Sequence, residues 1–368
     1  MTAPGRSFPL SAPASAAAVP SVVLGIKPWK RWQIRRFLGP GVVYTLKPER
    51  ALREQARRGG GIAVWAAREP AGFAAAAAAQ NAPLLRIEDG FLRSVGLGSN
   101  HVGGASLVVD AEGIYFDSRT PSALEKRLQA GGFEPALLNR AAALRRSLID
   151  SGLSKYNIGE RRGVDIGGAT GQRRLLVVGQ VENDASLRLG SPLLRGNLEL
   201  LRRVRAAEPQ AWIVYKPHPD TEAGTRPGAL ADAAVLSHAD QIVRGVSITT
   251  LFGQIDALHT LTSLAGFEAL LRGVAVTTWG QPFYAGWGLT DERAPNPRRT
   301  RRLTLDELVA GALIVYPRYA DPRTGAACEV EAVVAQLAAA GAAGSRGQRS
   351  RLRRYTRLLA GLLRGALR

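Results

Sequence analysis

A histidine and a lysine stand in a proline-rich turn, Tyr215 to Asp220, directly after a short apolar run at 211–214. Such a run is typical of a buried parallel strand, and Pro217 and Pro219 end it because proline cannot donate to the sheet ladder. Ligands of open α/β sheets bind outside the carboxyl ends of the strands. We therefore expect Lys216 and His218 to act on an anionic group, although a structural histidine in a rigid turn would give the same pattern.

A pair of carboxylates ends another apolar run, at 84–87. Glu88 and Asp89 are followed by Gly90, which predicts a tight turn that aims one carboxylate into the crevice. Arg93 is near enough in sequence to hold that carboxylate ionised or to bind an anionic substrate group. The alternative is a surface turn with a solvated acidic pair.

A third candidate site is the start of the helix predicted at 261–271. Thr262 and Ser263 stand where unpaired backbone N–H groups and the helix dipole favour a phosphate, although such residues are more often plain N-caps. Glu268 would reach a ribose hydroxyl if a nucleotide lay along this helix. The loop at 279–288 carries four aromatic residues, which suit either stacking on a base or sugar or filling an interdomain cleft.

Alternating strands and helices must position these residues, so we expect an α/β protein with parallel sheets. The first half predicts strands at 42–46, 62–65 and 84–87, helices at 50–58 and 72–80, and a hairpin joining 107–110 to 113–117. The second half predicts a helix at 197–207 and strands at 175–178, 211–214, 234–237, 257–260 and 274–278. A polar, glycine-rich stretch at 159–174 separates the halves and predicts domains at 25–160 and 172–340.

The bulk composition narrows the function classes. The 368 residues suffice for two domains, and one cysteine with four histidines makes a disulfide framework or a zinc site improbable, which also fits a reducing cytoplasm. The net charge is +19, concentrated near the two ends, and the nearly neutral middle argues against nucleic acid as a partner.

Both ends of the chain are unlike the middle. Residues 1–24 are rich in Ala, Pro and Ser, which predicts a disordered lead-in. Residues 27–37 are basic with interleaved aromatics, which fits a helix either on a lipid headgroup layer or packed on the first domain. The tail 341–368 includes eight arginines and no acid, with one leucine-rich helical face, a pattern we interpret as a basic amphipathic helix on an anionic membrane.

Several of these motifs together resemble the β-Kdo transferases of capsular polysaccharide biosynthesis, where Kdo is 3-deoxy-manno-octulosonic acid. The similarity covers about Gly25 to Leu337, and is closest to the second of two tandem modules in the long capsule protein. The motifs that carry it are Arg86 to Ser99, Ser154 to Asn157, Gly179 to Ser186, Tyr215 to Asp220, His259 to Glu268 and Gly280 to Leu289.

The resemblance implies two Rossmann-like domains facing a cleft, the glycosyltransferase B-type fold, with the acceptor on the first domain and the nucleotide sugar on the second. It implies transfer of Kdo from CMP-Kdo, with retention and without a further cofactor or metal. The acceptor would be a lipid-linked, phosphatidylglycerol-type glycan at the cytoplasmic face of the bacterial inner membrane, where other capsule biosynthesis or export proteins would be partners.

The resemblance also assigns roles to single residues. Asp89 corresponds to the catalytic nucleophile, with Glu88 beside it, and His218 to the group on the CMP phosphate. The donor site would consist of Gln180, Lys216, Thr262, Ser263, Glu268 and, for the Kdo carboxylate, Arg93. The chain departs from the family in having one module and in Asn183, which replaces an expected acid. A transferase for another sugar nucleotide and a catalytically silent glycan-binding module remain alternatives.

Overall fold

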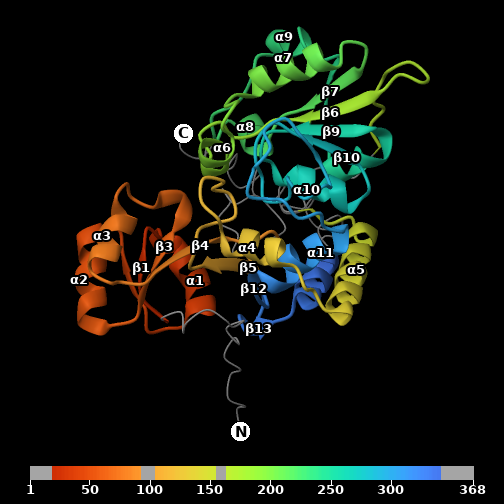
Figure 1. The fold of residues 1–368 in the computed structure, drawn as a ribbon. Helices are drawn as coiled ribbons and strands as arrows, with labels where there is room; N and C mark the ends of the chain where they lie inside the picture. The colour runs from red at the N-terminus through yellow and green to blue at the C-terminus, as the bar shows by residue number, and fades with distance from the viewer. Residues whose placement is uncertain (1–18, 93–103, 155–162, 341–368) are drawn as a thin grey trace, which may run out of the picture.

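The computed structural model describes residues 19–92, 104–154 and 163–340, which form two sheets flanked by helices (Figure 1). One sheet has seven strands and the other has six. The expected α/β class with two parallel-sheet domains is confirmed. No helix in these described ranges is both long and apolar enough to cross a membrane.

The first sheet has the strand order β13-β12-β5-β4-β3-β1-β2. Strands β1 to β4 pair in parallel, whereas β5 runs antiparallel to β4, and β12 runs antiparallel to β5 and β13. The strands are β1 Pro20–Leu24, β2 Val43–Thr45, β3 Gly61–Trp65, β4 Leu84–Asp89, β5 Ser106–Asp110, β12 Pro317–Ala320 and β13 Ala327–Cys328.

Short helices connect and cover these strands. Proline stands in the first turn of η1, α2 and α5, where its missing N–H has no helical partner to lose. They are η1 Pro28–Lys30, α1 Arg31–Leu38, α2 Pro48–Arg58, η2 Ala66–Arg68, α3 Phe73–Ala79, α4 Ala123–Ala130 and α5 Pro135–Asp150.

The second sheet is parallel throughout, in the order β11-β10-β9-β6-β7-β8. Its central strands are buried along nearly all of their length because helices or loops cover both faces. The strands are β6 Arg174–Val178, β7 Trp212–Lys216, β8 Gln241–Ile242, β9 Ala257–Thr260, β10 Ala275–Thr278 and β11 Asp291–Glu292. The helices of this half are α6 Ala185–Gly190, α7 Asn197–Ala207, α8 Pro219–Glu222, α9 Asp232–Leu236, α10 Leu264–Leu271 and α11 Leu305–Val309.

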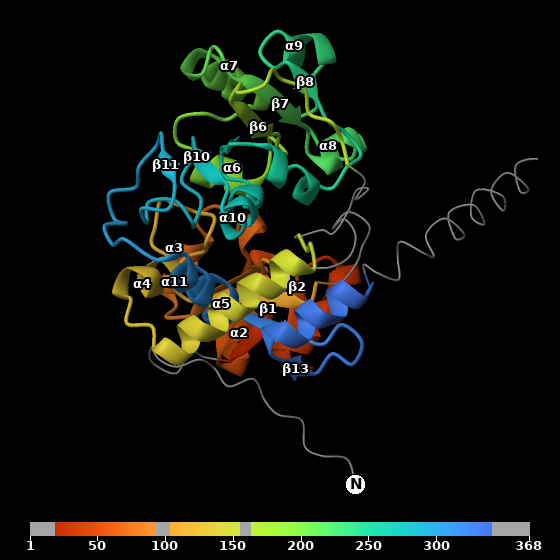
Figure 2. The same ribbon diagram turned by 90° about the vertical axis from the view of Figure 1, so that its right-hand side faces the viewer.

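The chain returns to the first sheet after completing the second. Strands β12 and β13 extend the first sheet, and a helix at 330–340 follows them. In both views α5 and α11 lie side by side next to the first sheet (Figure 2). Residues 317–328 therefore belong to the first sheet, although the predicted range 172–340 assigned them to the second domain.

The aromatic loop at 279–288 fills the space between the halves. Tyr284 and Trp287 are fully buried, and Phe283 packs on Phe91 of the first half with ring centroids 4.4 Å apart. These rings belong to one large core with Phe267 of α10. The loop thus supplies interdomain packing, and the rings of Tyr284 and Trp287 are fully enclosed by it.

Two predictions in the first half are wrong. The expected lead-in at 1–24 contains β1, whose Val22, Val23 and Leu24 are buried between β2 and β3, while residues 1–18 lie outside the described ranges. The expected hairpin is also absent, because the Asp110 carboxylate accepts hydrogen bonds from the backbone N–H groups of Glu112 and Gly113 and closes a turn there. Strand β5 pairs with β4 and β12 instead.

One strand predicted in the second half is a helix. Residues 234–237 overlap α9, in which Val235 is buried and Leu236 is exposed. A strand in a parallel sheet would have buried both residues. The helix 197–207 has the predicted bounds.

Candidate active site

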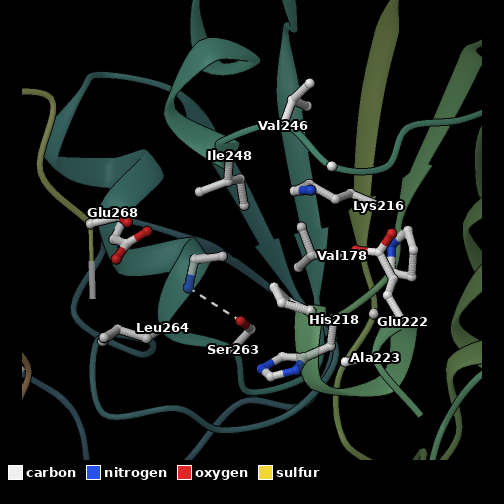
Figure 3. A pocket seen from close by; sticks show the side chains of 16 residues that line it. Val178, Lys216, His218, Glu222, Ala223, Val246, Ile248, Ser263, Leu264 and Glu268 are labelled. Atoms are coloured by element: carbon white, nitrogen blue, oxygen red, sulfur yellow. Dashed lines mark hydrogen bonds between the residues drawn. The ribbon is translucent and has the colours of Figure 1, made fainter. Parts of the chain in front are cut away.

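Two hollows adjoin at the carboxyl end of β7. The β7 pocket has a volume of about 410 Å³ and is lined by Val178, Lys216, His218, Glu222, Ile248 and Glu268, among others (Figure 3). The interdomain cleft has a volume of about 660 Å³ and is lined from both halves, by Lys30, Asp89, Gln180 and Phe283 among others. His218, Ser263 and Leu264 line both hollows. A ligand filling the β7 pocket would therefore enter the cleft past these three residues.

His218 is fixed at this junction by the turn that follows β7. It is the N-cap of α8, and its Nδ1 accepts a hydrogen bond from the backbone N–H of Asp220 at 3.1 Å. Because an accepting Nδ1 carries no proton, the neutral ring carries its proton on Nε2. His218 can thus donate a hydrogen bond to an anionic group at the junction.

Lys216 and Glu222 bring opposite charges to the β7 pocket. Lys216 is the last residue of β7 and is buried, and this burial lowers the pKa of its ammonium group. Burial likewise raises the pKa of the Glu222 carboxyl group. Val178 and Ile248 form apolar parts of the pocket wall. The pocket thus combines an apolar surface with a few charged groups, as small-molecule sites commonly do.

Gln180 joins the end of β6 to the start of α10. Its Oε1 accepts a hydrogen bond from the Thr262 backbone N–H at 2.8 Å, and its Nε2 donates to Thr262 Oγ1 at 3.1 Å. Both residues are buried and both line the cleft. Gln180 therefore positions the turn before α10 as well as forming part of the wall.

Ser263 and Glu268 are carried by α10. Ser263 is the N-cap, and its side chain accepts a hydrogen bond from the Ala265 backbone N–H at 3.2 Å (Figure 3). The plain N-cap role is therefore present, and the same helix start faces both hollows. Glu268 is buried further along the helix and lines the β7 pocket.

Asp89 faces the cleft from the end of β4. The Lys30 ammonium group lies 2.9 Å from each of its carboxylate oxygens, and Gln33 Nε2 lies 3.5 Å from Oδ1. Glu88 also lines the cleft, but its oxygens accept hydrogen bonds from the backbone N–H groups of Ala67 and Asp89. In this arrangement Glu88 braces the strand end that carries Asp89.

The sequence motifs did not identify Lys30 or Gln33 as site residues. Both belong to the basic aromatic run at 27–37, whose helix packs on the first sheet and buries Gln33, Ile34 and Phe37. The alternation of cations with tryptophans was the only signal, and it fits several roles. Arg93 lies outside the described residues. Within those residues, no group of three or more His, Cys, Asp or Glu side chains gathers as metal ligands would.

Comparison with known proteins identifies the family. The model of the family described as "Capsule polysaccharide biosynthesis protein" matches residues 61–319. This chain belongs to that family. The match includes the ends of β4, β6, β7 and β9, from which the site residues project.

Related proteins support the same assignment. The chain is 50% identical over 249 residues to the capsule polysaccharide modification protein LipA of Neisseria meningitidis serogroup A, covering 68% of this chain and 35% of LipA. It is 44% identical over 263 residues to the lipopolysaccharide-processing protein LpsZ of Rhizobium meliloti, covering 70% of this chain and 59% of LpsZ. The chain thus spans about a third of the length of LipA and 59% of that of LpsZ.

Two solved structures share the fold at 34% sequence identity. The β-Kdo 2,4 transferase of Thermosulfurimonas dismutans KpsC superposes with a TM-score of 0.74, covering 87% of this chain and 98% of that one. The β-Kdo 2,7 transferase of the same protein superposes with a TM-score of 0.71, covering 86% of this chain and 98% of that one. The Rossmann-like, glycosyltransferase B-type fold and the similarity to Kdo transferases are thereby confirmed, and the family places the chain in capsule polysaccharide biosynthesis.

Proposed function

We propose that this protein is a retaining β-Kdo glycosyltransferase that moves Kdo from CMP-Kdo to a lipid-linked acceptor in capsule biosynthesis. The observation that carries this assignment is the placement of Asp89 in the cleft, which adjoins the β7 pocket at His218 and Ser263. A carboxylate on one side and a polar pocket on the other suit a sugar nucleotide whose anomeric carbon lies between them. CMP-Kdo is the donor substrate in this reaction, and no separate cofactor takes part.

The β7 pocket would hold the CMP part of the donor. The phosphate would lie at the start of α10, where the hydroxyl groups of Thr262 and Ser263 and the helix dipole favour an anion, and Lys216 lines the same pocket as Ser263. Glu268 would accept a hydrogen bond from a ribose hydroxyl. Gln180 would hold the Thr262 turn against β6 while the phosphate is bound.

Asp89 would be the nucleophile of a double displacement. Its carboxylate oxygen attacks the anomeric carbon, and the bond from that carbon to the phosphate oxygen breaks, so that CMP leaves with the electron pair. His218 donates a hydrogen bond from Nε2 to the leaving phosphate. An acceptor hydroxyl then attacks from the side opposite Asp89, the bond to Asp89 breaks, and the hydroxyl proton passes to water; the two inversions give overall retention.

The acceptor side of the cleft suits a substrate held at a membrane surface. Trp29 lines the cleft and Trp32 follows on α1, with 36% and 48% of their surfaces exposed. Exposed Lys27 and Arg35 lie in the same segment. Tryptophan with basic residues is typical of protein surfaces that rest on anionic lipid headgroups. We therefore place the protein peripherally on the cytoplasmic face of the inner membrane, with a phosphatidylglycerol-type glycan acceptor and other capsule biosynthesis or export proteins as partners.

The test is direct transfer. CMP-Kdo is generated in situ and supplied with a synthetic Kdo-terminated acceptor to the native chain and to Asp89→Asn, and the product is analysed by NMR. We expect a β-linked product from the native chain and a loss of on the order of 10³-fold or more in Asp89→Asn, as for other nucleophile replacements. Glu112→Gln, on the exposed pair with Lys126, is the control.

Three outcomes would contradict parts of this proposal. A folded native chain that binds CMP but transfers no Kdo would rule out a Kdo transferase acting as a single chain. Transfer of a different sugar from another CMP-sugar would identify the alternative donor. Retained transfer in Asp89→Asn would assign the nucleophile elsewhere.

A further inference from the structure

The buried Lys30 ammonium group contacts both the Asp89 carboxylate and the Trp65 ring. Its Nζ lies 2.9 Å from both carboxylate oxygens and 3.6 Å from the centroid of the Trp65 ring. The residue is only 8% exposed. The ammonium group is thus sandwiched between the anion at the end of β4 and the aromatic face at the end of β3.

The burial of Lys30 depends on its partners. Removing an ammonium group from water is unfavourable unless the charge is paired, and Asp89 supplies the pairing charge. The turn η1 carries Lys30 to this position: Pro28 begins the turn, Lys30 ends it, and α1 continues directly from it. Trp65 compensates part of the lost hydration through its ring face.

We propose that Lys30 is the positioning residue that keeps Asp89 ionised and oriented toward the sugar, and that stabilises this carboxylate when it leaves in the second displacement. This role rests on the proposed function. A cation in contact with a carboxylate favours its charged form, which is the form able to attack. Contact with both oxygens also restrains the position of the carboxylate at the end of β4.

The charge changes during the reaction explain why a fixed cation is useful. When Asp89 bonds to the anomeric carbon, its negative charge is lost to the leaving phosphate. When the acceptor oxygen attacks, the bond between the anomeric carbon and Asp89 breaks and the electron pair returns to the carboxylate. Lys30 is then already in place beside the developing charge, so no reorganisation is needed at that moment.

The test separates charge from geometry with two variants. Lys30→Met keeps the length and apolar contact with Trp65 but removes the charge, whereas Lys30→Arg keeps the charge in a different shape. Lys47→Met, at an exposed position of the same domain, is the matched control. Each protein is labelled with carboxyl-¹³C aspartate, and the Asp89 signal, assigned by comparison with Asp89→Asn, is followed by NMR across the acid pH range.

We expect Asp89 to titrate at higher pH in Lys30→Met than in the native chain, and at the native position in Lys47→Met. In the transfer assay, Lys30→Met should lose about 100-fold in kcat with little change in KM for the donor. The acid limb of its pH–activity profile should move to higher pH. Lys30→Arg should keep the native titration of Asp89 while still losing activity.

An unchanged Asp89 titration in Lys30→Met would overturn the role. A rise in donor KM without a change in titration would also overturn it, and would show that Lys30 binds the donor instead. The NMR measurement needs no turnover, so it reports on Lys30 even if the native chain transfers no Kdo. The absence of Kdo transfer by the native chain would count against the proposed function, but not against the role of Lys30 beside Asp89.

Discussion

His218 and Asp89 both owe their positions to the way a strand stops. Each stands at the carboxyl end of a parallel strand, in a turn that proline or glycine forces immediately afterwards. That combination is visible in the sequence, which is why both residues could be predicted. Lys30 and Gln33 could not, because they come from a separate helical segment, 59 and 56 residues before Asp89.

The role of His218 can be separated from its structural role. We expect His218→Asn to keep the N-cap of α8, because asparagine also accepts a hydrogen bond at this position, but to lose the Nε2 donor. Transfer should fall by about 10²- to 10⁴-fold, the usual contribution of a general acid or base. Steady-state kinetics with matched thermal unfolding curves would check this. Equal activity in the variant would mean that His218 only shapes the turn.

At the scale of elements, the two halves are joined by a buried ionic contact. Glu125 of α4 accepts hydrogen bonds from Arg298 and Arg299, at 2.7 and 3.0 Å. Arg299 also donates to the backbone carbonyl of Ala285 in the aromatic loop. Glu125 and Arg299 are 7% exposed each, so this contact ties the loop of the second half to a helix of the first.

Replacement of Glu125 should therefore be costly. We expect Glu125→Gln to lower the free energy of unfolding by about 3–5 kcal/mol, because Arg299 would keep its charge in a buried site without the carboxylate that contacts it. Urea denaturation followed by fluorescence would measure the loss. Glu112→Gln, which breaks the exposed pair with Lys126, should cost less than about 1 kcal/mol. Equal losses in the two variants would show that burial does not govern the contact.

The elements that the sequence misplaced are short and depend on distant partners. Strand β1 lies between β2 and β3, consists mostly of Val22, Val23 and Leu24, and is preceded in the sequence by a segment rich in Ala, Pro and Ser. Helix α9 is five residues long, and its short run of apolar residues is equally typical of a buried strand. The longer periodic helices, such as α7, were predicted closely because their pattern repeats over several turns.

At the scale of the whole molecule, acid should destabilise the fold through His259. This histidine is buried on β9, and its Nδ1 accepts a hydrogen bond from Trp279 at 3.3 Å. Burial, with nearby Arg173 and Arg293, lowers its pKa from 6.5 to about 4. Between these values the unfolded chain binds a proton that the folded chain does not, so stability falls as the pH falls from 6.5 to about 4.

The size of this effect is testable with one variant. The 2.5-unit difference corresponds to about 3 kcal/mol lost over that interval and no further loss below it. His259→Asn keeps an acceptor for Trp279 and removes the titrating group. Urea denaturation at a series of pH values should therefore show a difference in the free energy of unfolding between the two proteins that becomes smaller toward pH 4. A difference that stays constant with pH would mean that another titrating group dominates the loss of stability in acid.

The sequence also predicted two sheets but not how the chain divides between them. Alternating strands and helices indicate parallel pairing among neighbours, and that held for β1 to β4 and for the second sheet. Nothing local marks β12 and β13 as strands of the first sheet. They have four and two residues, and β5, which pairs with β12, lies some two hundred positions earlier. Tyr316, just before β12, likewise donates a hydrogen bond to Asp110, 206 residues before it.

This return of the chain has a consequence for its biosynthesis. A ribosome delivers β1 to β5 first, and the free edge of β5, with buried Leu107 and Val108, then waits for β12 to emerge. The second sheet, made of strands contiguous in the chain, can close during that interval. The cleft wall that carries Asp89 would thus reach its final form last, after the pocket that carries His218.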